Sequence, residues 1–375
     1  MKVVVAIDSF KGSLTSMEAG EAAKRGIMKT GNHEVEVRPL ADGGEGTTEA
    51  LISGLGGQFI NIDVTGPMGK KVTARYGILR DNKTAIIEMA EAAGITLVQK
   101  DNLDPWKATT YGLGEMIIDA IERGCRDFII GIGGSATTEV GIGMLQALGY
   151  KFYDAAGKLL SYTFEDLGRI SSIDDSNVEK MLDECNFNIA CDVKNPLYGK
   201  NGAVYIFGPQ KGVKDAEKET MDDMVKHFAK VADEKYGSDN DRLPGTGAAG
   251  GLGFAFRTFF KNVNLKPGIE IVLNAIELEK LLCTADVVVT GEGRLDGQTA
   301  MGKVPVGVAK MAKKHGCKVI AVAGAVTEDA IACNYEGIDA FFPIVRGACT
   351  LEEAMDKNNA IKNMEATVEQ IFRLL

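Results

Sequence analysis

The stretch Val3-Val-Val-Ala-Ile7 decides the fold class, because an unbroken apolar run of this kind is typical of a buried parallel strand. Thr15-Ser-Met-Glu18 follows with the spacing of a helix capping box, and Gly31 predicts the end of that helix. A second strand is expected at residues 34–40 and a second helix at 47–55. This β-α-β-α order predicts a doubly wound parallel sheet.

The same pattern returns towards the end of the chain. Strands are expected at residues 286–290, 318–323 and 340–345, with a helix at 304–314 and a long polar helix at 350–375. The first and last parts of the chain therefore predict one α/β domain built from two separate stretches.

The middle of the chain has a mixed pattern. Residues 59–64 and 72–79 alternate between apolar and polar, as antiparallel strands do, on either side of a Gly-Pro turn. Further strands are expected at 85–89 and 127–132, and helices at 112–123, 179–185 and 218–235. A mixed α/β arrangement is therefore expected here.

The length of 375 residues favours two domains, because a single core stops growing at about 250–300 residues. We predict a discontinuous Rossmann-like α/β domain made of residues 1–58 plus 283–375. Residues 59–282 would form a mixed α/β domain inserted into it. We expect a cleft between the two domains.

Composition excludes several classes of protein. The formal net charge of −10 argues against non-specific nucleic-acid binding, and no apolar run is long enough to span a membrane. The seven cysteines include no Cys-x-x-Cys pair, so we expect a reduced, cytoplasmic protein with buried thiols. Histidine occurs only three times, so the chemistry is expected to rest on carboxylates, lysines and backbone amides.

Glycine is in excess, at 45 of 375 residues against a usual share of about 7%. Residues 245–253 contain a Gly-x-Gly-x-x-Gly pattern, but a polar stretch precedes it where a strand is required. We therefore assign that segment to close packing and not to dinucleotide binding. The excess gathers in five segments that predict sharp turns or close approach to a ligand: 42–47, 131–143, 199–202, 245–253 and 291–307.

Two polar segments follow the first two expected strands. Asp8-Ser9-Phe-Lys11-Gly-Ser13 places a lysine and two hydroxyls where a phosphate or carboxylate binds in such folds, with a capped turn as the alternative. Asp42-Gly-Gly-Glu45-Gly-Thr47 offers two carboxylates for Mg²⁺ or for substrate hydroxyls, with a tight turn as the alternative.

Three later segments also gather polar groups after expected strands. Gly133-Gly134-Ser135-Ala-Thr137 suits an anion held by backbone amides, and Asp192-Val-Lys-Asn195 suits a metal or a substrate. A glycine-rich turn needed for close packing is the alternative for the first, and an Asx-turn ahead of proline is the alternative for the second. The third segment resembles a P-loop but lacks its final Ser or Thr; it carries Glu292, Arg294, Asp296, Gln298 and Lys303.

Taken together, these segments resemble the bacterial glycerate kinases, and the resemblance covers essentially the whole chain. Seven ordered blocks carry it: residues 8–13, 41–47, 132–137, 191–197, 207–212, 247–253 and 290–299. One departure concerns the third block, which the family usually continues with Asn-Asp-Gly-Gly. Here it continues with Thr138-Glu139-Val140-Gly141, and we expect a locally different backbone because valine does not readily take a positive φ.

The resemblance implies ATP-dependent phosphorylation of D-glycerate to 2-phosphoglycerate by a two-domain α/β enzyme. The alternatives are a kinase that gives 3-phosphoglycerate, a kinase for another small hydroxy acid, and a binding protein for a phosphorylated ligand. Phosphoryl transfer needs positioning, Mg²⁺ and positive charge more than covalent chemistry. The roles of single residues follow from this requirement.

We assign the expected roles by residue type. Asp296 is the first choice for the general base and Asp192 the second, with Lys11 and Lys303 supplying positive charge. Arg294 would grip the glycerate carboxylate. The remaining candidates are Asp8, Ser9, Asn195 and Gln298 for substrate, Gly133, Gly134, Ser135, Thr137 and Glu292 for the nucleotide, and Asp42 and Glu45 for the metal.

Overall fold

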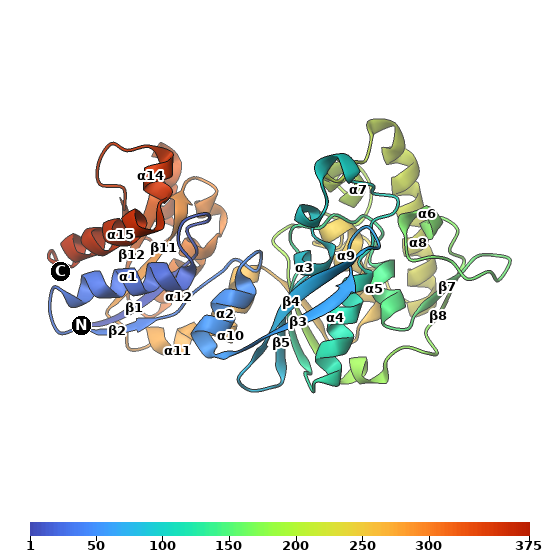
Figure 1. Ribbon diagram of the computed structural model, residues 1–375, viewed down its shortest axis with the longest axis horizontal. Coiled ribbons are helices and arrows are strands. Elements are labelled where there is room, and N and C mark those ends of the chain that lie inside the picture. The colour runs from blue at the N-terminus through green and yellow to red at the C-terminus, as the bar shows by residue number, and fades with distance from the viewer. The chain divides into compact units, whose positions relative to one another are not determined.

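A five-stranded parallel sheet carries the two ends of the chain, in a computed structural model that describes residues 1–375 (Figure 1). Its strand order is β13-β12-β11-β1-β2. The crossover connections this order requires are those of a doubly wound sheet, which confirms the predicted α/β class. The strands are β1 (Lys2–Ile7), β2 (Glu34–Val37), β11 (Val287–Leu295), β12 (Lys318–Val326) and β13 (Ala340–Pro343).

Helices cover both faces of this sheet. On one face Val3, Val5 and Ile7 pack with α1 (Ser16–Met28) and α15 (Lys357–Phe372) in one apolar core. Val4 is fully buried although alternation points it to the other face, so that face is covered too. The other helices joined to this sheet are α2 (Thr47–Leu55), α10 (Gly268–Ala275), α11 (Leu278–Leu282), α12 (Val304–Lys314), α13 (Ala332–Tyr335) and α14 (Leu351–Met355).

Helix α1 begins as the sequence predicts. The Thr15 side chain accepts a hydrogen bond from the Glu18 amide, and the Glu18 carboxylate accepts one from the Thr15 amide. Gly26 lets α1 approach α15 closely, because a Cβ there would lie 2.3 Å from the Glu365 carbonyl oxygen. The two helices are labelled side by side in Figure 1.

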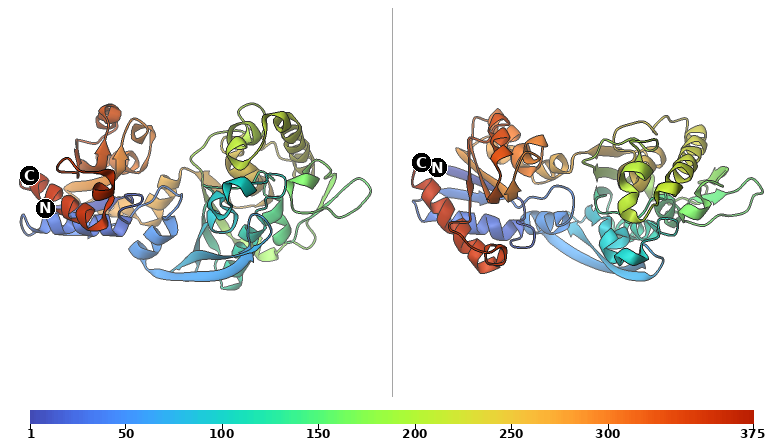
Figure 2. Two further views of the ribbon diagram at one scale, coloured as in Figure 1. Left: turned by 45° about the horizontal axis from the view of Figure 1, so that its top comes forward. Right: turned by 90° about the horizontal axis from the view of Figure 1, so that it is seen from above.

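The central part of the chain forms a separate six-stranded sheet with the order β10-β9-β6-β5-β4-β3. Strands β3, β4 and β5 pair antiparallel, which confirms the alternation in the sequence, and β5, β6, β9 and β10 pair parallel. The β3–β4 pair forms the long ribbon at the edge of this sheet in Figure 2. The strands are β3 (Gly57–Thr65), β4 (Lys71–Leu79), β5 (Thr84–Glu88), β6 (Asp127–Gly131), β9 (Asn186–Ala190) and β10 (Val263–Lys266).

One apolar core joins this sheet to its helices. Phe128 and Phe187 stack at its centre with ring centroids 4.9 Å apart, and Phe256 packs against Phe187. A small hairpin of β7 (Lys151–Tyr153) and β8 (Ser172–Asp174) lies outside the main sheet. The helices are α3 (Ala90–Ala93), α4 (Tyr111–Glu122), α5 (Ile142–Ala147), α6 (Phe164–Leu167), α7 (Ala203–Phe207), α8 (Lys218–Tyr236) and α9 (Leu252–Phe259).

The chain divides into two compact units. The terminal unit comprises Met1–Asp42, Glu49–Gly56 and Ile269–Leu375, and the central unit comprises Gly43–Thr48 and Gly57–Gly268. Residues 269–282, which the sequence pattern had placed in the inserted domain, therefore pack with the terminal unit.

Several expected elements differ from the structure; β2, for example, ends at Val37 and not at residue 40, and β12 runs on to Val326. Strand β11 runs on to Leu295 because it keeps pairing with β12, where Arg294 faces Ala325. The helix expected at 179–185 is a short 3₁₀ turn at Lys180–Glu184. The long helix expected at 350–375 is two helices, since Asp356 ends α14 and caps α15 by accepting from the Asn359 amide.

The cysteines are all unpaired, and Cys125, Cys185, Cys317 and Cys333 are buried. Cys283 and Cys349 are exposed, so the expectation of buried thiols is wrong for these two. None of the helices combines the length and the apolar character that crossing a membrane requires.

Candidate functional site

A cavity of about 520 Å³ in the terminal unit brings together half of the predicted site residues. They come from the ends of β1 and β11, from the segments after β1 and β2, and from the start of α12. The carboxyl edge of a parallel sheet is where such folds bind ligands. The predicted residues that line the cavity, which we call the terminal pocket, are Asp8, Ser9, Lys11, Asp42, Glu292, Arg294, Asp296 and Lys303.

Asp8 is the most perturbed acid of this pocket. It follows β1 directly, is 7% exposed, and accepts a 2.6 Å hydrogen bond from the Ser9 amide. Burial, with repulsion from Asp42 as the next cause, raises the pKa of Asp8 to about 7. A carboxyl group poised near neutrality is suited to exchanging a proton with a substrate hydroxyl.

Glu292 and Asp296 are tied to the turn that follows β11. Glu292 Oε1 accepts a 2.5 Å hydrogen bond from the Thr299 hydroxyl, and burial raises the Glu292 pKa. Asp296 Oδ1 accepts from the backbone amides of Gln298 and Thr299, at 3.0 and 3.2 Å. Gln298 thus serves this turn through its backbone and does not line the terminal pocket.

Three cations face these carboxylates in the terminal pocket. Arg294 Nε lies 3.6 Å from Asp296 Oδ2, and the Arg294 side chain is 66% exposed, so most of its donors are open to a ligand. Lys303 stands at the N-cap of α12, and Lys11 is exposed in the turn after β1. A small ligand with both a carboxylate and hydroxyl groups can satisfy both kinds of side chain.

The rest of the lining of the terminal pocket is largely apolar. It includes Phe10 and Ile344, which are buried, and Leu351 and Met355 of α14, which are exposed. The pocket therefore combines charged side chains from the strand ends with an apolar surface that includes part of α14.

A second set of predicted residues lies in the central unit, at the carboxyl ends of β5, β6 and β9. Segment 43–48 reaches these strand ends because Gly43 and Gly131 carry no Cβ: one added at Gly131 would lie 2.3 Å from the Gly43 carbonyl oxygen. Glu88, at the end of β5, fixes the segment by accepting hydrogen bonds from the Gly46 and Thr48 amides at 3.1 and 2.8 Å. Glu45 of this segment is exposed.

The loop after β6, residues 132–137, leaves three successive amides available. Its backbone is fixed by the Gly134 carbonyl, which accepts from Ile95 at 2.8 Å, and by the Ala136 amide, which donates to Ala93 at 2.9 Å. The amides of Gly133, Gly134 and Ser135 donate to no acceptor in the protein, and both glycines are exposed. Successive free amides of this kind form an anion-binding concavity.

A lysine that the sequence reasoning did not assign lies behind this loop. Lys211 is 1% exposed, and its ammonium donates to Ser135 Oγ and to the Thr137 carbonyl oxygen, both at 2.6 Å. Thr137 also carries a buried hydroxyl with no hydrogen-bond partner. The signal in the sequence is the block 207–212, which is one of the seven that carry the resemblance.

Glu139 holds neighbouring loops together inside the central unit. It is fully buried and accepts hydrogen bonds from the Thr110 hydroxyl, the Thr110 amide and the amides of Gly141 and Gly143. Burial raises the pKa of Glu139. The next residue, Val140, has φ of +58°, so the expectation that valine would avoid a positive φ here is wrong. The fully buried Val140 side chain packs in the apolar core and its amide is hydrogen-bonded, and these contacts hold the conformation.

Asp192 and Asn195 follow β9. Asp192 is exposed, and its Oδ1 accepts a 3.0 Å hydrogen bond from the Gly268 amide. The Asn195 side chain donates to the Asn201 carbonyl oxygen at 2.8 Å, so that amide closes its own turn. Asp192 therefore has the more open side chain of the two.

The packing assignment for residues 245–253 is confirmed. A Cβ on Gly247 would lie 2.1 Å from the Pro196 carbonyl oxygen, and one on Gly250 would lie 2.1 Å from that of Thr137. The segment therefore supports the loop after β6 from behind.

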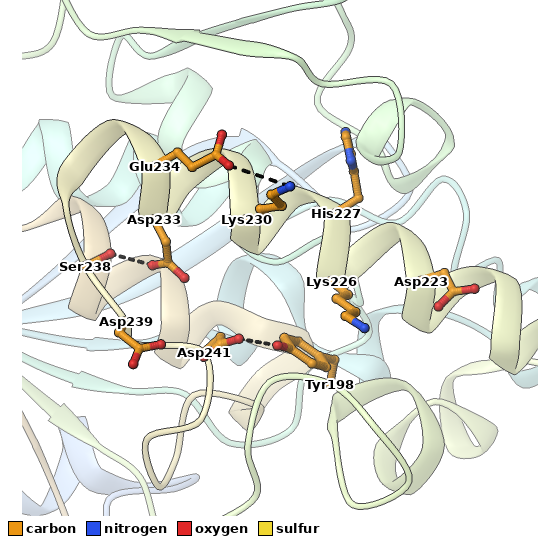
Figure 3. Close-up of a pocket in the computed structure, with 10 residues that line it drawn as sticks. All are labelled: Tyr198, Asp223, Lys226, His227, Lys230, Asp233, Glu234, Ser238, Asp239 and Asp241. Carbon is orange, nitrogen blue, oxygen red and sulfur yellow. Dashed lines mark hydrogen bonds and ion pairs between the residues drawn. The ribbon is translucent and has the colours of Figure 1, made fainter.

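A second cavity, of about 590 Å³, lies along α8 and contains none of the predicted site residues (Figure 3). Among its residues, Asp241 accepts from the Tyr198 hydroxyl, Asp233 accepts from the Ser238 hydroxyl, and Lys230 lies 3.7 Å from Glu234. We assign it no role. It is lined by Tyr198, Asp223, Lys226, His227, Lys230, Asp233, Glu234, Ser238, Asp239 and Asp241.

Comparison with known proteins identifies relatives over the whole chain. A family model described as the glycerate kinase family matches residues 3–375. The glycerate 2-kinase of Escherichia coli K12 is 45% identical over 355 residues, which cover 94% of this chain and 93% of that protein. The glycerate kinase of Bacillus subtilis 168 is 44% identical over 372 residues, covering 99% and 97%. A crystal structure of a glycerate kinase 2 from Salmonella typhimurium LT2 superposes with a TM-score of 0.92 at 42% identity, covering 100% of this chain and 98% of that one.

Proposed function

The chain belongs to the glycerate kinase family and is a kinase, and from this premise we propose that it transfers the γ-phosphoryl group of ATP to D-glycerate, giving 2-phospho-D-glycerate and ADP. Membership of the family supports the phosphorylation of glycerate, and a kinase takes a nucleotide as its second substrate. The single observation that carries the assignment to residues is the terminal pocket, in which four carboxylates and three cations meet at the strand ends.

Arg294 binds the carboxylate of glycerate in this proposal. Its guanidinium is largely open to solvent at the pocket and presents donors in a fixed fork, which matches a carboxylate better than a lysine does. Lys11 and Lys303 add positive charge for the substrate carboxylate and the transferred phosphoryl group. Ser9 and Glu292 offer hydrogen bonds to the glycerate hydroxyls.

Asp8 is a stronger candidate for the general base than Asp296. In the transfer step the substrate oxygen attacks the γ-phosphorus, its proton passes to the carboxylate, and ADP leaves with the electrons of the broken bond. The Asp8 pKa of about 7 suits this exchange, whereas Oδ1 of Asp296 is committed to the backbone of its turn. Asp192, in the central unit, stays the next candidate.

The loop after β6 binds the phosphates of ATP. The free amides of Gly133, Gly134 and Ser135 supply donors that need no rearrangement, as in other phosphate-binding turns. Thr137 supports the loop from inside, where its carbonyl oxygen accepts from Lys211.

The donor chemistry of segment 42–45 fits Mg²⁺. No group of three or more His, Cys, Asp or Glu side chains is arranged to hold a metal by itself. A kinase needs only one or two carboxylates, because phosphates and water complete the octahedron around Mg²⁺. Asp42 and Glu45 are oxygen donors of the right kind, and bound Mg²⁺ would offset the negative charge of the nucleotide.

A larger hydroxy acid is a second candidate substrate, because the terminal pocket is spacious and has an apolar wall at α14. Purified protein with MgATP should release ADP with D-glycerate and much less with lactate or tartrate. The phosphorus–proton coupling in the NMR spectrum of the product distinguishes the 2-phosphate from the 3-phosphate. No ADP release with glycerate would overturn the proposed reaction, and faster release with tartrate would favour the second candidate.

Substitution of the three acids tests the base. Loss of a true general base lowers kcat by about 10²–10⁴-fold. We expect that loss for Asp8→Asn and a smaller one for Asp296→Asn. If Asp192→Asn abolishes turnover while Asp8→Asn keeps near-normal kcat, the base belongs to the central unit.

A further inference from the structure

Lys211 is a buried cation with no carboxylate within ion-pair distance. Its ammonium lies at the end of a 3₁₀ turn, Pro209–Lys211, and its two hydrogen bonds go to neutral oxygens of Ser135 and Thr137. An ammonium has three donors, so one remains beyond these two acceptors. Burying such a charge costs free energy unless an opposite charge pairs with it and hydrogen bonds satisfy it.

The Ser135 hydroxyl is oriented by this contact. A hydroxyl carries one hydrogen, and because Ser135 Oγ accepts from Lys211, its own hydrogen points elsewhere. Ser135 Oγ makes no other hydrogen bond in the protein, although the residue is only 6% exposed. Its hydrogen is therefore free to meet an acceptor that is brought to the loop.

The backbone of the same loop also offers hydrogen-bond donors to an incoming acceptor. The free amides of Gly133, Gly134 and Ser135 already form a set of donors. The Ser135 hydroxyl extends that set by one donor, and Lys211 places a positive charge behind it. These three amides, the hydroxyl and the ammonium are all donors, and such a set favours an anion.

We propose that Lys211 is a positioning residue for the phosphates of ATP: it fixes the loop after β6 through the Thr137 carbonyl and turns the Ser135 hydroxyl into a donor for a phosphate oxygen. Lys211 does not touch the nucleotide, because it is buried beneath the loop. The inference rests on the proposed role of this loop in binding ATP.

Protonation of Lys211 responds to the bound anion. Burial lowers the pKa of Lys211 to about 7, and the nearby Glu139 carboxylate, itself fully buried, acts in the opposite direction. An anion held on the loop favours the charged ammonium, so binding draws a proton onto Lys211 between about pH 7 and 9. The affinity for ATP then falls as the pH rises through this range.

Isothermal titration with ATP and Mg²⁺ tests the proposal on four proteins: wild type, Lys211→Met, Ser135→Ala and the double variant. Lys211→Met keeps the unbranched chain as far as its fourth atom and removes the ammonium with its charge and donors. Val213→Ala is the matched control, because Val213 is buried in the turn that follows Lys211 but contacts neither Ser135 nor Thr137 in any hydrogen bond. Titration in two buffers of different ionisation enthalpy measures the proton taken up.

We expect Lys211→Met to weaken ATP binding by about 10–100-fold, as loss of a charge-assisted contact does, and to abolish the proton uptake. Ser135→Ala should weaken binding by about 10-fold. Because Lys211 acts through Ser135, the double variant should bind about as weakly as Lys211→Met alone. Val213→Ala should bind ATP with proton uptake, like the wild type.

Two results would overturn the role of Lys211: a Lys211→Met protein that binds ATP as the wild type does, or effects of the two substitutions that multiply in the double variant. Wild-type protein that binds ATP but does not phosphorylate glycerate would overturn only the proposed reaction. Wild-type protein that binds no ATP would overturn both.

Discussion

The amide of Val140 donates a 3.0 Å hydrogen bond to the carbonyl oxygen of Gly250, and Val140 makes this contact in a left-handed conformation with φ of +58°. The bond ties the end of the β6 loop to the glycine-rich segment behind it. A β-branched residue pays a steric cost in this region of backbone space, because its Cβ crowds the neighbouring carbonyl. Val140 is nevertheless fully buried, so the packing of its side chain offsets part of that steric cost.

Stability of Val140 variants should reveal this strain. Glycine normally makes a protein less stable than alanine by about 0.5–1 kcal/mol inside a helix. At position 140 the order should reverse, with Val140→Gly more stable than Val140→Ala by about 1 kcal/mol, because only glycine escapes the left-handed penalty. Urea unfolding of both variants measures the difference.

Val225 in α8 is the matched control, being a fully buried valine in regular helix. There the alanine variant should be the more stable of the two. The same order at both positions would show that Val140 carries no strain.

Gly250 should tolerate no side chain. It has φ of +69°, and an added Cβ would lie 2.1 Å from the Thr137 carbonyl oxygen. Gly250→Ala should therefore lower the free energy of unfolding by about 3 kcal/mol, combining overpacking with backbone strain. Because the Thr137 carbonyl also accepts from Lys211, weaker ATP binding should accompany the loss.

Gly237 separates the cost of backbone strain from the cost of overpacking. It ends α8 with φ of +65°, and nothing lies within 4 Å of an added Cβ. Gly237→Ala should cost about 1 kcal/mol, which is the backbone term alone. Equal losses in the two variants would mean that the contact between Gly250 and Thr137 relaxes freely.

The sequence predicted the structural features that depend on residues close together in the chain. The apolar run of β1 and the capping box at Thr15 are both present, since each rests on neighbours within a few residues. Glu88 and Lys211 were missed because their partners are distant in the chain: Glu88 holds amides 40 and 42 residues away, and Lys211 reaches Ser135 across 76. No spacing rule points to such contacts.

The sequence also does not show which carboxylate has a perturbed pKa. Asp296 stands among several polar residues, and its carboxylate is held by the turn that these residues form. Asp8 was predicted to bind substrate, and burial beside Asp42 raises its pKa. Burial is a property of the folded sheet, which explains why the sequence alone does not reveal this shift.

Arg294 should govern the affinity for glycerate. Removal of a charge-assisted contact to a carboxylate costs about 1.5–3 kcal/mol, so Arg294→Ala should raise KM for glycerate by about 10–100-fold while kcat changes little. Arg294→Lys should recover only part of the affinity, because lysine lacks the planar fork. Arg80→Ala, at an exposed arginine in the turn after β4, is the control. A loss confined to kcat would contradict the binding role.

Asp8 should make the stability of the protein depend on pH. In the unfolded chain this carboxyl loses its proton near its ordinary pKa of 3.8, whereas in the folded protein burial raises the pKa to about 7. Between these values the folded state binds more protons than the unfolded state, so stability falls as the pH rises from about 4 to 7. Asparagine carries no proton to lose, so Asp8→Asn should gain stability relative to the wild type over the same range, by up to about 4 kcal/mol.

Thermal unfolding of the wild type and Asp8→Asn at pH 4, 5.5 and 8 measures this gain. Asp174→Asn is the control, since hydrogen bonds from Ser176 lower the pKa of Asp174 below its ordinary value of 3.8. The effect of this substitution on stability is therefore nearly complete at pH 4 and should change little between pH 4 and 8. If the difference between Asp8→Asn and wild type stays constant from pH 4 to 8, Asp8 titrates normally in the folded protein, and its proposed role as the base loses its physical ground.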